Sequence, residues 1–69
     1  MSDHVYKITE LYGSSPKGIQ PAIENAVAQA AKSVRNMRWL QVTEIRGHLE
    51  KGAIGHWQVG VKIGFTVEP

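Results

Sequence analysis

The residues best suited to binding chemistry lie in two alternating segments that flank a short turn at Lys51-Gly52. Trp39 and Arg46 belong to the first segment, and Gln58 belongs to the second. An indole can stack on a flat aromatic heterocycle. An amide offers a donor and an acceptor to the edge of such a ring, and a guanidinium can contact a phosphate. These types and positions are typical of a site for a planar heterocyclic ligand.

Each of these residues also has a structural interpretation. Trp39 could close one end of the core, as Trp57 is expected to do, because aromatic side chains mostly serve packing. Gln58 could be an ordinary exposed glutamine of a strand. Arg46 could pair with Glu44, although a surface ion pair contributes only about 0–1 kcal/mol. The residue types alone leave both interpretations open.

Other site chemistries find less support. His48 and His56 are expected to face each other across the turn, but two imidazoles without a completing carboxylate or thiolate make a weak metal site. The sequence contains no GxGxxG, P-loop, GxSxG or HExxH motif. The serines have no triad-like partner, so we expect neither a metal nor an enzyme. Tyr6, on the first predicted strand, is expected in the core or in an interface.

The length of 69 residues predicts a single domain over residues 1–69. Folds this small usually need disulfides, a metal or partner subunits for stability. The chain has no cysteine, and its three histidines are scattered. Oligomerisation is therefore the expected source of additional stability.

Charge and hydropathy exclude two classes of partner. The formal net charge is +2, and the charges alternate in sign without a basic block, so nucleic-acid binding is not expected. No apolar run reaches the roughly 18 residues that span a bilayer. The first five residues lack the basic and apolar regions of a signal peptide. We expect a protein of the cytoplasm that binds no membrane.

The N-terminal half predicts one strand and one helix. Residues 5–12 alternate with β-branched and aromatic types, which indicates a strand that ends at Gly13-Ser14-Ser15-Pro16. We expect Ser14 or Ser15 as the N-cap, Pro16 as the first helical residue, and a helix to about Arg35 that is regular only from about Pro21. Asn36 is a plausible left-handed stop. The expected apolar stripe is Ile19, Ile23, Ala26, Val27, Ala30 and Val34.

The C-terminal half predicts an antiparallel hairpin about Lys51-Gly52. The predicted pairs are His48 with His56, Arg46 with Gln58, Glu44 with Gly60, Gly47 with Trp57, Ile45 with Val59 and Thr43 with Val61. This register turns the side chains of Trp57, Val59, Val61, Ile63, Phe65 and Val67 toward the helix. The other face carries Glu44, Arg46, His48, His56, Gln58 and Lys62, with Leu40 and Val42, and would be a subunit interface or a ligand wall. The fold class is α+β in the order β-α-β-β, with a three-stranded antiparallel sheet wrapped around one helix.

Together these residues resemble the bacterial type of the dodecin family of small flavin-binding proteins. The likeness covers about residues 4–68. It is carried by His4-Val5-Tyr6-Lys7, Gly13-Ser14-Ser15, Glu24-Asn25-Ala26, Arg35-Asn36, Trp39, Val42, Glu44-Ile45-Arg46-Gly47-His48, Trp57-Gln58 and Gly64-Phe65.

The resemblance implies a hollow homododecamer that stacks flavins in pairs between symmetry-related tryptophans. Trp39 would be the stacking platform, Gln58 would bind the pyrimidine edge, and Arg46 would contact the phosphate or the ribityl chain. Glu44 and His48 would be wall residues, and Tyr6 joins the candidate binding residues. The implied role is flavin storage and protection from photochemistry without turnover.

The implied ligand is FMN or riboflavin, with FAD as a further candidate. The alternatives are a shell that binds coenzyme A, or a structural shell, with weak flavin binding; a flavin oxidoreductase ranks lower. The chain also departs from the family. Many bacterial members have an arginine where this chain has Thr66, which leaves a preference for FMN over riboflavin open. Pro21 replaces a usual acidic or polar residue and should disturb only the first helical turn. Met37-Arg38 replaces a pair such as Leu-Asp, which implies a more basic pocket rim.

Overall fold

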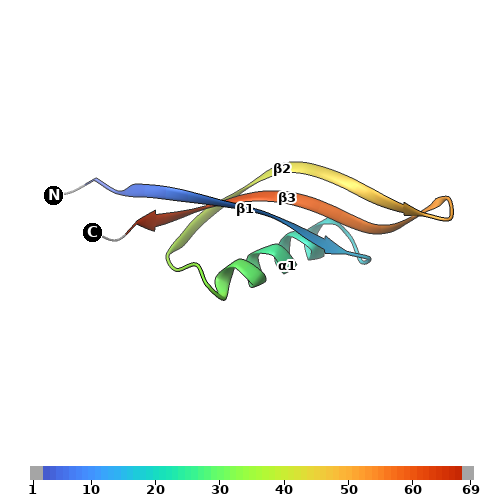
Figure 1. Ribbon diagram of the computed structural model, residues 1–69, viewed down its shortest axis with the longest axis horizontal. Coiled ribbons are helices and arrows are strands. Elements are labelled where there is room, and N and C mark those ends of the chain that lie inside the picture. The colour runs from blue at the N-terminus through green and yellow to red at the C-terminus, as the bar shows by residue number, and fades with distance from the viewer. Residues whose placement is uncertain (1–2, 68–69) are drawn as a thin grey trace.

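A computed structural model describes residues 3–67 and has the predicted β-α-β-β order (Figure 1). The predictions for residues 1, 2, 68 and 69 lie outside this described part. Strand β1 is Val5–Ser15, helix α1 is Ile19–Ala31, strand β2 is Met37–Glu50 and strand β3 is Ala53–Val67. All pairing is antiparallel in the order β1-β3-β2, with the last strand in the centre. Within residues 3–67 no helix is long and apolar enough to cross a membrane.

The first strand is longer than the alternation predicted. It continues past Tyr12 through Ser15, which pairs with Trp57, so the strand ends near the end of the predicted stop segment Gly13-Ser14-Ser15-Pro16 and not at its beginning. Gly13 allows the strand to continue beneath the helix, because a Cβ there would lie only 2.9 Å from both the nitrogen and the Cβ of Ala26. The hydroxyl of Ser15 accepts a hydrogen bond from the Lys17 amide at 3.0 Å, so this serine stabilises the turn instead of capping the helix.

The helix therefore begins and ends elsewhere than predicted. Gly18, at φ 152°, takes the N-cap position without a side-chain cap, and the helix starts at Ile19 instead of Pro16. Pro21 is the third helical residue, where the missing N–H would have no partner within the helix, so the first turn is helical. The helix ends at Ala31 and not near Arg35. Asn36 does adopt a positive φ of 63°, but it does so just before β2.

The core is formed between small helical residues and branched residues of the central strand. The predicted inward face of β3 is confirmed for its middle, where the side chains are fully buried, whereas its ends are only partly buried. On the helix, Ala22 is buried although it was not part of the predicted apolar stripe, whereas Ile19, which was part of it, is 37% exposed. Alanines let the helix axis lie close to the sheet, and the longer Ile23 and Val27 pack at the sides. The buried core residues are Ala22, Ala26, Ala30, Val59, Val61 and Ile63.

The hairpin register is confirmed from His48 to Glu44, whereas an irregularity between His48 and Leu49 shifts the pairs next to the turn. The pairs of His48 with His56, Arg46 with Gln58, Glu44 with Gly60, Gly47 with Trp57 and Ile45 with Val59 all form as predicted.

Beyond Glu44 a β-bulge changes the pairing. Val42, and not Thr43, lies opposite Val61, because the register shifts between Val42 and Glu44. The extra residue reverses the facing of the residues before it as far as Trp39, where a second irregularity begins. Leu40 and Val42 therefore face the helix side with Ile63 and Val61, and their predicted place on the polar face is wrong.

The molecule is elongated, and its sheet extends past the helix (Figure 1). Its extents are 56 × 20 × 13 Å, and its radius of gyration is 14.4 Å. A compact chain of this length has a radius of gyration of about 11 Å. The helix packs against β1 and β3, whereas β2 is exposed from Arg38 to Glu50. Large apolar side chains consequently lie on the surface, and such a surface is typical of a chain that packs against partners. They include Val5, Tyr6, Ile8, Tyr12, Leu40, Val42, Ile45, Leu49 and Ile54.

Candidate functional site

Trp39 lies on the surface of the sheet and does not close the end of this chain's core. Its side chain is 42% exposed on β2, opposite Gly64 of β3. Tyr6 of β1 meets the indole edge-on, with ring centroids 4.9 Å apart and planes at 67°. Gly64 makes room for the ring, because a Cβ there would lie 2.6 Å from Cη2 of Trp39. The indole thus has a fixed edge contact and remains open to solvent.

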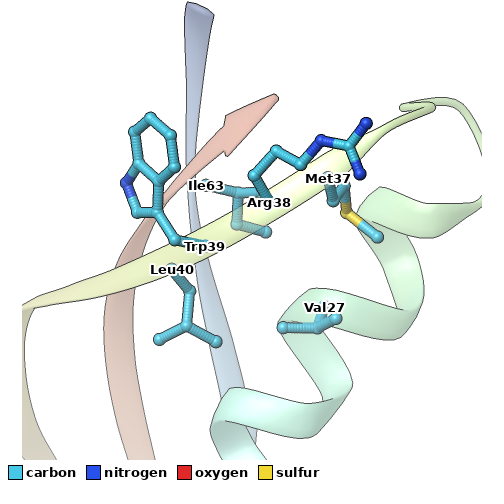
Figure 2. Close-up of a pocket in the computed structure, with 6 residues that line it drawn as sticks. All are labelled: Val27, Met37, Arg38, Trp39, Leu40 and Ile63. Carbon is cyan, nitrogen blue, oxygen red and sulfur yellow. The ribbon is translucent and has the colours of Figure 1, made fainter. Parts of the chain in front are cut away.

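A shallow apolar pocket lies beside Trp39. It has a volume of about 220 Å³ and is lined by Val27, Met37, Arg38, Trp39, Leu40 and Ile63. Figure 2 shows the indole and the Leu40 side chain extending to opposite sides of β2, with Leu40 on the side of the helix. The indole therefore lies on the outer face of the sheet, which the helix does not cover. Arg38 also reaches this face, where its Nε donates to Oγ1 of Thr66 at 2.8 Å.

A polar cluster occupies the middle of the same outer face. Arg46 donates from Nε to Oε1 of Gln58 at 2.9 Å. Its guanidinium lies 3.6 Å from Oε1 of Glu44, and its Cζ lies 4.8 Å from the centroid of the Tyr12 ring. The Tyr12 hydroxyl donates to the same Glu44 oxygen. Arg46 therefore pairs with Glu44 and also fixes the oxygen of Gln58, which leaves the amide N–H groups of Gln58 available to a ligand.

Tyr12 is the member of this cluster that the sequence did not identify as functional. The alternation of the first strand placed it on the same side as Tyr6, but nothing local showed that it lies opposite Gly60, beside Glu44. The hydrogen bond to the Glu44 carboxylate is the main reason why the pKa of Tyr12 is raised above its usual value of 10.0. Smaller contributions come from desolvation and from the negative charge of Glu44, and the positive charge of Arg46 opposes them.

His48 lies apart from both groups, near the tip of the hairpin. Its Nε2 is 3.9 Å from Oε1 of Glu50, and Nδ1 of His56 is 3.6 Å from the same oxygen. Among residues 3–67 no group of three histidine, cysteine, aspartate or glutamate side chains is arranged to hold a metal ion. Within residues 3–67, the recorded hydrogen bonds, ion pairs and ring contacts link His48 only to Glu50, and not to Trp39 or to the polar cluster.

The predicted site residues share one face but do not meet at one point within a single chain. Gly64, opposite Trp39, and Gln58 are six positions apart on β3, which corresponds to about 20 Å. The bulge near Val42 places Trp39 on the same face as Glu44, since strict alternation would put these two residues on opposite faces. One ligand ring could contact both Trp39 and Gln58 only if two copies of the chain supplied them.

Comparisons with known proteins agree on one family. The family model Dodecin matches residues 5–68. The protein Dodecin of Thermus thermophilus is 41% identical over 64 residues, which are 93% of each chain. The structure of dodecin from Streptomyces coelicolor has a TM-score of 0.94 at 46% identity and covers 100% of this chain and 99% of its own. A more distant structure, at 26% identity and a TM-score of 0.82, is the calcium dodecin of Mycobacterium tuberculosis, a calcium-chelating antigen with a calcium-binding site; it covers 94% of this chain and 93% of its own.

Proposed function

The chain belongs to the dodecin family, and we propose that it binds and stores flavin, with the isoalloxazine ring stacked on Trp39. The observation that carries this proposal is the exposed indole on the outer face of the sheet. Gly64 lies beneath the indole and Tyr6 lies at its edge, so the ring is oriented before a ligand arrives. Stacking on an aromatic side chain contributes about 1–3 kcal/mol per ring.

The second wall of the site comes from another copy of the chain. Family membership implies oligomeric assembly, and we propose the homododecamer that the sequence resemblance implied. Trp39 and Gln58 lie about 20 Å apart along one chain. A flavin that stacks on one Trp39 would therefore receive its pyrimidine-edge hydrogen bonds from the Gln58 of a partner. In this way symmetry supplies what a chain of 69 residues cannot enclose alone.

The proposed role is sequestration without turnover. A flavin stacked on both faces leaves no open face for a substrate. The polar cluster of Glu44, Arg46 and Gln58 offers hydrogen bonds and charge for orienting a ligand. A stacked indole would also quench the excited flavin, which protects it from photochemistry.

A titration tests this proposal directly. Adding the purified protein to FMN or riboflavin should quench most of the flavin fluorescence at micromolar protein, and the particle should have the mass of a dodecamer. Because the Trp39 indole is the proposed quencher, the loss of flavin emission reports stacking. Unchanged flavin emission, or a monomeric particle, would refute the proposal.

The alternatives give other results in the same preparation. A coenzyme-A-binding or structural shell would purify colourless and leave flavin emission unchanged, and the former would bind coenzyme A. A flavin oxidoreductase would oxidise a reduced nicotinamide with an acceptor faster than free flavin does. None of the contacts described above favours these functions over storage.

A further inference from the structure

We propose that Arg38, held by Thr66, selects ligands that carry a phosphate group, so that the chain binds FMN more tightly than riboflavin. This inference rests on the proposed flavin site at Trp39 and names the residue that would discriminate between its ligands. FMN and riboflavin share the same ring and ribityl chain and differ only in the terminal phosphate. A cation near the stacking platform would provide this discrimination, because it binds the charged phosphate and not the terminal hydroxyl of riboflavin.

The backbone places Arg38 on the same face as Trp39. Strand β2 is irregular between Met37 and Trp39, so Arg38 has no partner in the pairing with β3. An unpaired residue in a bulge can turn its side chain away from the strict alternation. The Arg38 side chain is directed to Thr66, two positions from Gly64 on β3 and therefore on the same face as the indole.

The guanidinium of Arg38 has the charge and the donors that a phosphate requires. Its Nε donates to the neutral hydroxyl of Thr66, and no carboxylate within residues 3–67 forms an ion pair with it. Its Nη1 and Nη2 atoms form no hydrogen bond or ion pair within residues 3–67, and together they can bind two phosphate oxygens at once. Arg46, by contrast, already contacts Glu44, Gln58 and Tyr12. Arg38 is therefore the better candidate for an added anion.

Thr66 has two effects in this arrangement. By accepting from Nε it holds the planar guanidinium in one orientation, which reduces the conformational entropy lost on binding. Its own hydroxyl proton remains available for a second acceptor, such as a phosphate oxygen. A threonine at this position thus positions a cation that the neighbouring strand supplies.

The test compares the dissociation constants of FMN and riboflavin by fluorescence quenching in the intact oligomer. The variants are Arg38→Gln, Arg38→Lys and Thr66→Val, and Lys17→Gln is the control that removes one positive charge before the helix. Wild type should bind FMN at least about tenfold more tightly than riboflavin, as a charge-assisted bidentate contact implies. Arg38→Gln should make the two dissociation constants about equal and should change riboflavin affinity less than about twofold. Arg38→Lys and Thr66→Val should reduce the ratio in part, and Lys17→Gln should preserve it.

Salt dependence provides a second readout. Raising the salt concentration should weaken FMN binding to wild type, because added ions screen the guanidinium, and should leave riboflavin binding nearly constant. Equal affinity of wild type for both flavins would overturn the role of Arg38 while leaving flavin storage standing. If Arg38→Gln weakened the binding of FMN and riboflavin equally, Arg38 would have only a structural role and its role in selecting phosphate would likewise be overturned. If neither flavin bound to wild type, both proposals would fail.

Discussion

The indole of Trp39 lies across Gly64 of the adjacent strand, with Cη2 2.6 Å from the position that a Gly64 Cβ would occupy. Tyr6 contacts the same indole edge-on from the far side of the central strand. One absent side chain and one aromatic neighbour thus set the orientation of the ring. The candidate stacking surface depends on Gly64 as much as on the tryptophan itself.

Replacing Gly64 with alanine should displace the indole. The added methyl group would overlap the ring of Trp39, and the ring, at the protein surface, can move more easily than the backbone. We expect flavin affinity to fall about tenfold, which is within the range of a single stacking contact, while the fold persists. Fluorescence titration measures the affinity and thermal unfolding checks the fold. Unchanged affinity would show that flavin does not depend on this orientation.

The two tryptophans should separate binding from folding. Trp39→Ala removes the exposed platform and should weaken flavin binding at least about tenfold, with little change in unfolding temperature. Trp57 is half-buried on β3 opposite Gly47, so Trp57→Ala should lower the free energy of unfolding by about 1–3 kcal/mol. Flavin titrations and chemical denaturation of both variants provide the comparison. The proposed site would be contradicted if Trp57→Ala abolished flavin binding and Trp39→Ala mainly lowered the free energy of unfolding.

The hairpin shows how much of a strand register can be predicted from the alternation of side chains along the sequence. The turn at Lys51-Gly52 and the match of Trp57 with Gly47 were sufficient to predict the register from His48 to Glu44. The bulge after Val42 was not predictable, because residues 40–45 contain no glycine or proline that would mark an extra residue in the strand. The resemblance identified Trp39 as a candidate for stacking because a residue's position in a family does not depend on strand alternation, and this role stays a prediction.

The first strand and the helix illustrate a second limit. Ser14, Ser15 and Pro16 form a standard capping pattern, yet pairing with the central strand extends through Ser15. Long-range strand pairing outweighed a local cap preference. The same non-local pairing brings Tyr12 next to Glu44, which is why Tyr12 was not identified. Both errors follow from contacts that join distant parts of the chain.

Gly13 should tolerate no side chain. In Gly13→Ala the new Cβ would overlap the carbonyl oxygen of Ala22 and lie 2.9 Å from two atoms of Ala26, so the helix would have to move away from β1. Overpacking of this kind costs about 1–3 kcal/mol. Gly47→Ala is the matched control, because its Cβ would meet only ordinary contacts at 3.7 Å or more. Thermal unfolding should show a clear loss for the first variant and little for the second.

The contact between Tyr12 and Glu44 predicts a pH dependence at alkaline pH. The pKa of Tyr12 is raised in the folded chain, mainly by the hydrogen bond to Glu44, so the folded state holds this proton more tightly than the unfolded state does. The corresponding stability is fully present below the usual pKa of 10.0 and is lost as the pH rises through the raised pKa. Wild type should therefore lose stability above pH 10 more steeply than Glu44→Gln.

A Tyr6→Phe background isolates the tyrosine concerned, because the chain has two tyrosines. The tyrosinate absorbance of this variant then reports Tyr12. Adding Glu44→Gln should shift the Tyr12 titration to lower pH, since the hydrogen bond to the carboxylate and its negative charge, which both oppose deprotonation, are lost. Replacing Arg46 with glutamine should instead shift the Tyr12 titration to higher pH, because the positive charge of Arg46 favours tyrosinate. Identical titrations in all three proteins would mean that Tyr12 and Glu44 do not interact in solution. Opposite shifts would place Tyr12, Glu44 and Arg46 in one electrostatic unit at the centre of the outer face.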